Sequence, residues 1–273
     1  MQWHEQSWPV IQRLDKRIPV VIPLGSCEQH GRHLPVLVDT FQVAAIAERV
    51  EQRLGNQVLM TPALWVGSSH HHLDFPGTIS LRPSLYTQVI QDMARCVLRA
   101  GFKRFFFLNG HGGNETPVAQ ALSELVATDD QADACHLALA SWWQVGRAAM
   151  APNRHGMASE ALSHACEYET SMMLFLRPEL VHQAQARDVV DRLKNAWVDS
   201  SAAGGRVAVF HRFARFTAPG SIGAPTQATA EKGKSLFGAV VDEIVNFLED
   251  FAHWPLPAAA SPPRPGKLKA ARP

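Results

Sequence analysis

The stretch from residue 20 to residue 40, VVIPLGSCEQHGRHLPVLVDT, constrains this chain more than any other. Its apolar run 20–24 ends at Gly25 and leads into Glu28, His30 and Asp39. A short apolar run that ends at a glycine is typical of a buried strand. Polar residues just past the carboxyl end of such a strand lie where α/β proteins bind their ligands. We therefore expect a ligand site at this end of the strand.

The residue types favour a metal as the ligand. Glu28 and His30 are two positions apart, so in an extended chain both side chains leave the same side of the backbone. Asp39 follows after a turn-rich segment that carries Gly31 and Pro35. A carboxylate, an imidazole and a second carboxylate that converge on one place suit a hard or borderline divalent ion.

The composition of the 273 residues allows a sizeable core and argues against two classes of partner. Hydrophobic residues make up 46% of the chain, and the net charge is +1. No basic stripe interleaved with aromatic residues is present, so we expect no nucleic-acid partner. No apolar stretch reaches the length of a membrane span, so we expect no membrane partner. The 13 histidines against two tyrosines raise the weight of metal sites.

The cysteines and the first residues indicate the compartment. Cys27, Cys96, Cys135 and Cys166 are scattered singly, which favours reduced thiols over a disulfide framework. The first residues lack the apolar segment of a signal peptide. We therefore expect a cytoplasmic protein.

Apolar runs and helical periodicity alternate along the chain. Strands are expected at 20–24, 58–66 (interrupted at Pro62), 105–108, 136–142 and 207–210, and helices at 41–54 (capped by Thr40), 84–100, from 114 onward, 161–176 and 228–251. This order predicts an α/β fold, a three-layer α/β/α sandwich with a mainly parallel sheet. We expect residues 1–255 to form one domain and the Pro/Ala-rich basic tail 256–273 to be disordered.

A second polar cluster, NGHGGN at 109–114, follows the buried strand 105–108. Its glycines let the backbone turn sharply and approach a ligand closely. His111 can be a simple hydrogen-bonding residue of a strand-to-helix turn, and the loop can also cradle a phosphate. Neither GxGxxG nor GxxxxGK[ST] is present, which argues against a nucleotide-binding protein. A metal site shared with the first cluster fits the residues better.

A third cluster, HACEYETS at 164–171, carries one imidazole and two carboxylates. If a helix begins near residue 164, His164 and Glu167 share a face, whereas Glu169 points elsewhere. Only one of the two glutamates then shares a pocket with His164, unless the helix begins between them. An ordinary amphipathic helix with a solvated acidic face explains the same pattern.

Other conspicuous residues allow simpler interpretations. Adjacent residues of an extended chain face alternate sides, so in the run 70–72 we expect His72 to line the pocket and the other two histidines to be solvated. Trp143 is expected either in the pocket wall or in the core. A small buried thiol is the favoured interpretation of Cys27, because no His–Asn pair is placed to activate it as a nucleophile.

Together these motifs resemble the creatininase family. GSCEQHGRHLPVLVDT is similar to its first signature, NGHGGN to its second, and HACEYETS to its third, while FPGTISL and GAPTQATAEKG resemble further family stretches. The resemblance runs from about residue 18 to residue 250. It implies a metal-dependent amidohydrolase with a three-layer α/β/α fold, two divalent ions (Zn, Mn or Fe) per chain and a homohexameric assembly.

The resemblance also implies roles for individual residues. The implied metal ligands are Glu28, His30, Asp39, His111 and Glu169; the implied catalytic residues are His164 and Glu167; and the expected substrate-binding residues are His72, Gly77, Thr78, Gly112 and Trp143. Asp39 would bridge the ions. The creatinine-hydrolysing members have a glutamate ligand at the position where this chain has Gly113. The resemblance therefore implies that Glu169, or else Glu167, supplies the missing carboxylate.

The chemistry follows from such a ligand set. Two ions about 3.5–4 Å apart lower the pKa of a shared water from 15.7 toward ~7 and polarise a carbonyl. His164 is then the candidate donor of a proton to the leaving amide nitrogen. At Gly112 the creatinine-hydrolysing members carry a tyrosine, so we expect another small amide: cyclic, formamide or peptide-like. The alternative is a non-catalytic metal- or ligand-binding protein that keeps the fold.

Overall fold

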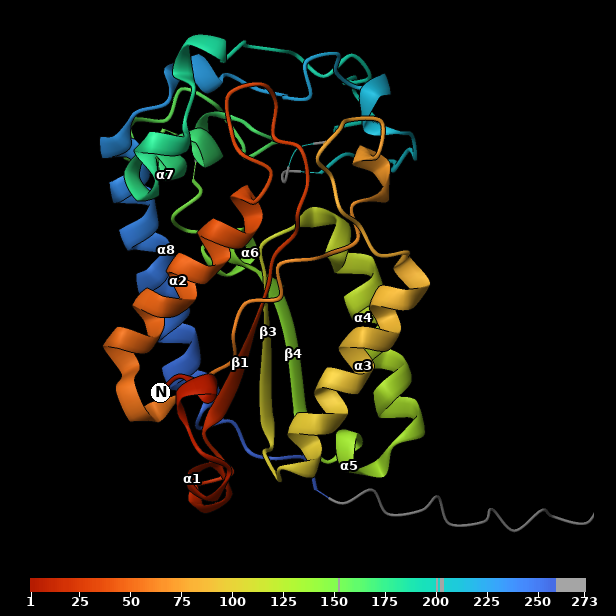
Figure 1. Ribbon diagram of the computed structural model, residues 1–273, viewed down its shortest axis with the longest axis vertical. Helices are drawn as coiled ribbons and strands as arrows, with labels where there is room; N and C mark the ends of the chain where they lie inside the picture. The colour runs from red at the N-terminus through yellow and green to blue at the C-terminus, as the bar shows by residue number, and fades with distance from the viewer. Residues whose placement is uncertain (152, 200, 202–203, 259–273) are drawn as a thin grey trace, which may run out of the picture.

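The computed structural model describes residues 1–151, 153–199, 201 and 204–258 (Figure 1). Its centre is a parallel sheet in the order β2-β1-β3-β4. The strands are β1 (Pro19–Leu24), β2 (Leu59–Met60), β3 (Arg104–Asn109) and β4 (His136–Ser141). Val20 is paired with both Leu59 and Phe105, which places β1 between β2 and β3. The predicted parallel sheet is confirmed.

Helices cover both faces of this sheet. They are α1 (Trp8–Arg13), α2 (Val38–Leu54), α3 (Pro83–Arg99), α4 (Glu115–Thr128), α5 (Asp130–Asp133), α6 (Trp142–Val145), α7 (Glu167–Leu176) and α8 (Ala230–Phe251). In Figure 1, α2 and α8 lie on one side of the strands and α3 and α4 on the other. The predicted three-layer α/β/α sandwich is therefore confirmed.

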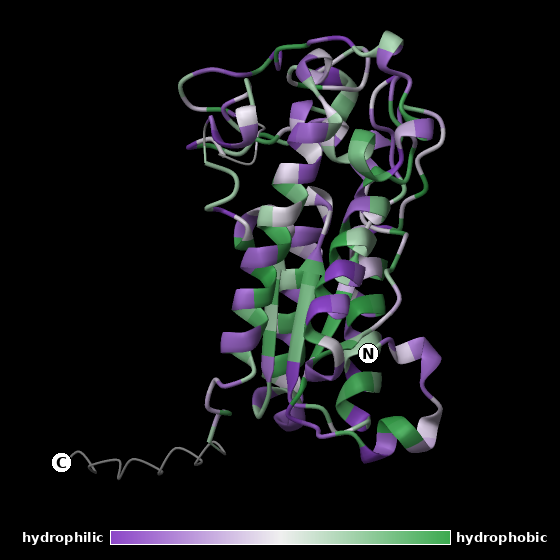
Figure 2. Ribbon diagram, turned by 90° about the vertical axis from the view of Figure 1, so that its left-hand side faces the viewer, coloured by the Kyte–Doolittle hydropathy of each residue, from purple (hydrophilic) through white to green (hydrophobic). Residues whose placement is uncertain are grey.

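The sheet is apolar on both faces because each face is covered. Phe105 and Phe107 of β3 pack in the cluster formed with α3 and α4, whereas Phe106 and Leu108 pack in the cluster formed with α2 and α8. All six residues of β3 are buried. Figure 2 shows the same pattern, with hydrophobic strands inside helices whose outer surfaces are hydrophilic. Such continuous apolar strands are typical of parallel sheets.

The close contact between the end of β1 and the start of α2 requires Gly25. A Cβ atom at this position would lie 2.3 Å from Thr40 Oγ1. Because glycine lacks that atom, the loop after β1 passes directly against α2. This contact brings the segment around Glu28 next to the first turn of α2.

Two predicted helix starts are wrong. The helix expected from residue 41 begins at Val38, and Thr40 does not cap it: Thr40 Oγ1 donates a hydrogen bond to the carbonyl of Ser26. The helix expected from residue 161 begins at Glu167, because Ala165 has a left-handed φ of 50° and Cys166 is extended. A residue in that conformation cannot continue a right-handed helix.

The strand expected at 207–210 is also wrong. These residues form no strand, and Phe210 is 92% exposed. The backbone amide of Val207 bonds to the carbonyl of Trp197 within the same loop region. β-Branched residues alone do not make a strand unless the segment pairs with a sheet.

Further sequence expectations concern the termini and the cysteines. Most of the tail expected to be disordered, residues 259–273, lies outside the described residues. Within the part of the chain that is described, no helix combines the length and the hydropathy needed to cross a membrane. The four cysteines are free, as their single spacing predicts.

Candidate active site

The candidate site lies where β1, β3 and β4 end, at the carboxyl edge of the sheet, and Asp39 is at its centre. Asp39 is in the first turn of α2 and is buried. Its Oδ1 lies 3.1 Å from His30 Nε2, and its Oδ2 lies 3.0 Å from His111 Nδ1. Ser26 Oγ donates to Oδ2 at 2.7 Å and fixes the carboxylate plane. One carboxylate therefore spans two imidazoles from different loops.

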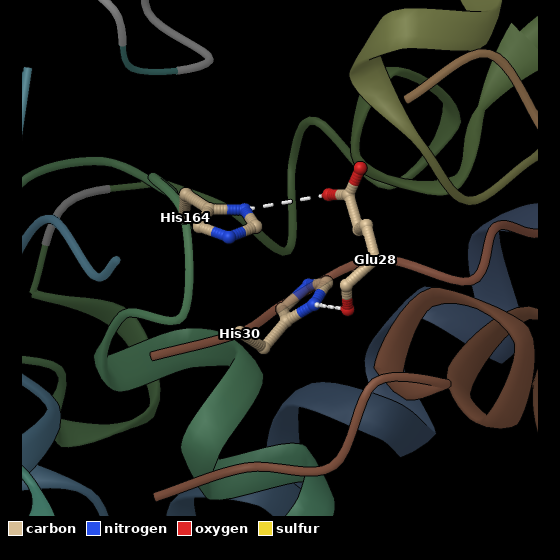
Figure 3. A group of neighbouring side chains, drawn as sticks. All are labelled: Glu28, His30 and His164. Carbon is tan, nitrogen blue, oxygen red and sulfur yellow. Dashed lines mark hydrogen bonds and ion pairs between the residues drawn. The ribbon is translucent and has the colours of Figure 1, made fainter. Parts of the chain in front are cut away.

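The hydrogen bonds of the two imidazoles determine which ring nitrogen faces Asp39. His30 Nδ1 lies 3.1 Å from the carbonyl oxygen of Glu28 (Figure 3), and His111 Nε2 lies 3.2 Å from the carbonyl oxygen of Ser68. A carbonyl only accepts, so these nitrogens carry the hydrogens. In the neutral rings, His30 Nε2 and His111 Nδ1 then present lone pairs to Asp39. This is the tautomeric arrangement of histidines that bind metals.

The neighbouring carboxylates favour positive charge on both imidazoles. Burial disfavours the charged ring of His30, but the neighbouring Asp39 carboxylate outweighs it and raises the pKa of His30 to about 9. Burial likewise opposes protonation of His111, whereas Glu28 and Asp39 raise its pKa well above the ordinary value. Metal ions and protons compete for such nitrogens. The electrostatics of the site therefore call for positive charge at two places beside Asp39.

Two further carboxylates flank the pair. Glu28 Oε2 lies 3.3 Å from His111 Nε2, and Glu169 Oε1 lies 4.0 Å from His30 Nε2. Burial, followed by repulsion from Asp39 and Glu28, raises the pKa of Glu169 to about 7. Three buried carboxylates this close are unstable together unless cations neutralise them.

The donor set fits divalent metals. Among the described residues, three groups offer ligand atoms within 4.8 Å of one another: His30 with Asp39 and Glu169, Glu28 with His71 and His111, and Glu28 with His30 and His164. Glu28 Oε2 and His30 Nε2 are buried and lack a hydrogen bond of acceptable geometry. Oxygen and imidazole donors without thiolate suit zinc, manganese or iron(II).

His164 approaches this cluster from the loop before α7. Its Nε2 lies 2.8 Å from the backbone carbonyl of Gln29, so this nitrogen is the donor. The opposite nitrogen, Nδ1, then carries a lone pair and lies 3.6 Å from Glu28 Oε1, as Figure 3 shows. Burial, together with the nearby His30 charge, lowers the pKa of His164 to about 3. A neutral imidazole thus points its free nitrogen at the cluster.

The side-chain amide of Gln29 holds the surrounding loops. Its Oε1 accepts from the Gly31 amide at 2.9 Å. Its Nε2 lies 2.8 Å from His72 Nδ1 and 3.0 Å from the carbonyl of Gly220, one acceptor for each of its two hydrogens. His72 therefore accepts at Nδ1 and carries its hydrogen on Nε2, which lies 3.6 Å from Glu28 Oε1.

These groups open into a cavity of about 410 Å³. The lining includes carboxylates of the cluster and several aromatic and glycine residues: Glu28, Asp39, His71, His72, His111, Gly112, Gly113, Trp143, His164, Glu169 and Phe213. A pocket of this volume accommodates a small organic substrate. His72, Gly112 and Trp143, three of the residues expected to bind substrate, line this cavity.

Glu167 does not lie with the cluster. Its buried carboxylate accepts hydrogen bonds from Lys232 Nζ at 2.7 Å and from the backbone amides of Ala158 and Ser159. Because α7 begins at Glu167, Glu169 is the glutamate that reaches His30 and Asp39. The structure thus does not place Glu167 where the expected catalytic role requires it.

Gly77 and Thr78 also lie outside the cavity lining. Thr78 Oγ1 accepts a hydrogen bond from the backbone amide of Gln29 at 3.1 Å, and the carbonyl oxygen of Gly77 lies 3.7 Å from Cys27 Sγ. Both residues support the backbone behind Glu28. Their motif is easily read as substrate-binding because sequence alone does not show which side of the loop faces the pocket.

His71 is one residue of the cavity that sequence reasoning missed. The run His70–His72 forms a 3₁₀ turn, not an extended chain. In this turn His70 bonds to Ser80 Oγ, while His71 and His72 both line the cavity. The expectation that His71 is solvated was wrong because it assumed alternating sides, whereas a turn places successive side chains about 120° apart.

The thiols near the site are inert. Burial raises the pKa of the Cys27 thiol, and burial together with Glu169 raises the pKa of Cys166 to about 12. Both side chains are buried. A nucleophilic role requires a lowered thiol pKa, so packing is the role that the surroundings of Cys27 and Cys166 support.

Glu28, His30, Asp39 and His111 lie together at one edge of the sheet, and the similarity of the chain to known proteins agrees with this arrangement. A family model described as creatinine amidohydrolase matches residues 4–248. The chain belongs to the creatininase family. It is a metal-dependent amidohydrolase of this family.

Relatives within the family carry different names. The chain is 32% identical over 234 residues to the mycofactocin precursor peptide peptidase of Mycobacterium tuberculosis (strain CDC 1551 / Oshkosh), which covers 83% of this chain and 82% of that protein. It is 30% identical over 246 residues to the creatinine amidohydrolase of Pseudomonas putida, covering 85% and 88% of the two chains. It is 29% identical over 270 residues to the 3-dehydro-scyllo-inosose hydrolase of Thermotoga maritima (strain ATCC 43589 / DSM 3109 / JCM 10099 / NBRC 100826 / MSB8), covering 92% and 83%.

Solved creatininase structures share the fold. A mutant creatininase complexed with creatine superposes with a TM-score of 0.77 at 26% identity, covering 92% of this chain and 98% of that chain. A mutant creatininase of the Zn–Zn type gives a TM-score of 0.77 at 25% identity with the same coverage. This chain thus has the fold of the solved creatininases, and it carries candidate metal ligands at the carboxyl edge of its sheet.

Proposed function

We propose that this chain hydrolyses the C–N bond of a small amide at a site for two divalent ions bridged by Asp39. The observation that carries the proposal is the placement of Asp39, whose two oxygens lie 3.1 Å from His30 Nε2 and 3.0 Å from His111 Nδ1. A bridging carboxylate needs one oxygen toward each ion. Glu169 then completes the position beside His30, and Glu28 completes the position beside His111.

The reaction divides between the bound ions and this chain's residues. Two such ions, when bound, would lower the pKa of a shared water from 15.7 toward ~7 and would polarise an amide carbonyl. His164 Nδ1 presents a lone pair to this place, because Nε2 is held by the Gln29 carbonyl. His164 can therefore accept the proton that the water loses and hand it to the amide nitrogen, which is a poor leaving group until protonated.

The pocket supports an amide other than creatinine. A Cβ added at Gly112 would meet no atom within 4 Å, so this wall is open. Trp143 and Phe213 supply flat apolar surface to the same cavity. The peptidase relative from Mycobacterium tuberculosis acts, by its name, on a precursor peptide. We therefore propose a peptide-like, formamide or cyclic amide substrate, with the peptide-like class favoured by the open wall.

Assembly and compartment complete the proposal. We propose a homohexamer, by resemblance to the family, and a cytoplasmic location, which the four free cysteines support. Light scattering of the purified protein checks the assembly.

The first test is metal content. Protein purified without chelator is compared with its Asp39→Ala variant by elemental analysis, and both are checked by circular dichroism. Wild type should carry close to two divalent ions per chain, and the variant should lose both, because one carboxylate serves both positions. One ion or none in wild type, unchanged in Asp39→Ala, would refute the two-ion mechanism.

A further inference from the structure

His71 lies beside the buried carboxylate and imidazole of Glu28 and His111. Its ligand nitrogen, one oxygen of Glu28 and one nitrogen of His111 all lie within 4.8 Å of one another. The rings of His71 and His111 are nearly parallel, with an interplanar angle of 11° and centroids 5.8 Å apart. His71 is half-buried and lines the cavity. Two imidazoles and a carboxylate thus surround one small volume.

The space that His71 occupies depends on Gly113. A Cβ at position 113 would lie 2.9 Å from His71 Cε1 and 2.4 Å from His111 Nε2. A side chain there and the observed positions of His71 and His111 exclude each other. Because position 113 is a glycine in this chain, the ring of His71 can lie this close to His111.

We propose that His71 is a direct ligand of the ion held by Glu28 and His111. This assignment deepens the two-ion site proposed above and rests on it. This position would then have two imidazoles and the Glu28 carboxylate, whereas the position beside His30 would have one imidazole and the carboxylates of Asp39 and Glu169. Imidazole-rich sites favour zinc, cobalt or iron(II) over manganese. The two positions of this chain should therefore differ in metal preference.

Packing offers His71 a different role. Its ring centroid lies 4.3 Å from that of His72 and 6.3 Å from that of Phe213. If His71 only supports these rings, its removal changes the stability of the metal-free protein or the substrate KM and leaves metal affinity alone. Metal affinity and the spectrum of the bound metal therefore separate the two roles.

The test uses Co²⁺ as a spectroscopic probe. Metal-free wild type, His71→Ala and the matched control His70→Ala are titrated with Co²⁺ by calorimetry and visible absorption. His70 is the adjacent imidazole of the same turn, but its Nδ1 bonds to Ser80 Oγ at 2.7 Å and it does not line the cavity. Thermal unfolding of the three metal-free proteins shows whether each variant folds.

We expect two equivalents of Co²⁺ in wild type and in His70→Ala. In His71→Ala one equivalent should keep its affinity, while the other weakens by at least about tenfold, with a changed d–d spectrum, since a ligand counts for more than the outer-shell groups whose loss costs 10–100-fold. Added free imidazole should restore that spectrum.

Two unaltered equivalents and an unaltered spectrum in His71→Ala would overturn the assignment and leave the two-ion site standing. Only one equivalent in wild type would instead refute the two-ion site. The His71 assignment would then be upheld if that single ion weakens in His71→Ala and overturned if it does not. A His71→Ala protein that does not fold is replaced by His71→Gln, which keeps a side chain of similar reach.

Discussion

Glu167 and Glu169 stand two positions apart at the start of α7, and their carboxylates bind on different sides of it. Glu167 accepts from Lys232 of α8 at 2.7 Å, and Glu169 accepts from the Ala165 amide at 2.5 Å and reaches toward His30. One helix start thus supplies a candidate metal ligand and a buried ion pair. The ion pair joins α7 to α8 and, through the Ser159 amide, to the loop that leads to His164.

Removing one partner of that pair should destabilise the protein. Lys232→Met leaves the buried Glu167 charge without its cation, and breaking a buried pair from one side costs about 3–5 kcal/mol. Urea unfolding of the metal-free protein measures the difference. Lys234→Met is the matched control, because Lys234 is an exposed lysine of the same helix. Equal stability of the two variants would contradict the prediction.

The contribution of Glu167 should depend on pH in a defined direction. Burial opposes its charge, but the bonds from Lys232 and from the Ala158 and Ser159 backbone amides outweigh it and lower the pKa of Glu167 below its ordinary value of 4.5. A lowered folded-state pKa gives stability that is present above the unfolded pKa and lost as the pH falls through the folded one. Unfolding of wild type and Glu167→Gln should therefore differ most at pH 7, and the difference should shrink as the pH falls from the ordinary value of 4.5 toward the lowered folded-state pKa. A difference in unfolding free energy that grows as the pH falls would contradict the prediction.

Gln29 should act as a positioning residue for His72 and for the loop at Gly220. In Gln29→Glu the new oxygen faces the Gly220 carbonyl, and His72 must move its hydrogen to Nδ1 to remain bonded. We expect kcat to fall about 10–100-fold with two ions retained, as for other groups that orient active-site residues. Metal analysis and kcat against KM check this. Gln183→Leu, which removes an amide bonded to the Ala228 carbonyl outside the cavity lining, is the control.

The neighbours Gly112 and Gly113 should respond in opposite ways to alanine. A Cβ at Gly112 meets nothing within 4 Å, whereas one at Gly113 lies 2.3 Å from the Ser68 carbonyl and 2.4 Å from His111 Nε2. Gly112→Ala should keep metal content and most activity. Gly113→Ala should lose metal, because His111 must shift. Elemental analysis measures the metal content of both variants. Equal metal content would contradict the prediction and show that the loop at residue 113 can shift to accommodate the added Cβ.

Gly112→Tyr tests the open wall of the pocket directly. The ring should fill the cavity beside Trp143 and lower kcat/KM for peptide-like amides at least about tenfold, with a smaller effect on formamides. Steady-state kinetics on both substrate classes measures the ratio. A uniform loss on both classes would indicate damage to the metal cluster instead of a narrowed pocket.

Thiol chemistry should be separable from catalysis. Cys96 is exposed on α3, whereas Cys27 and Cys166 are buried and have raised pKa values. Iodoacetamide at pH 8 should modify Cys96 first and leave amide hydrolysis intact, and Cys27→Ser should retain activity. Mass spectrometry and an activity assay on the same sample check this. Loss of activity with modification at Cys27 would support a nucleophilic thiol.

Residue patterns alone predict the layered α/β fold and the segments that meet at the site. Apolar runs such as the one before Gly25 can only be buried, and carboxyl ends of parallel strands meet at one edge, so Glu28 and His111 had to come close. The pairing of carboxylate with imidazole also predicted a metal from residue chemistry alone.

Tertiary structure decided the details that depend on one or two backbone angles. The left-handed Ala165 starts α7 at Glu167, and this single turn sends Glu169 to the cluster and Glu167 to Lys232. The 3₁₀ turn at His70–His72 brings His71 to the pocket. Both features arise because distant segments fix a local conformation that periodicity does not encode. Residue types specify the chemistry of this site, and only packing against other segments selects which of two neighbouring side chains performs it.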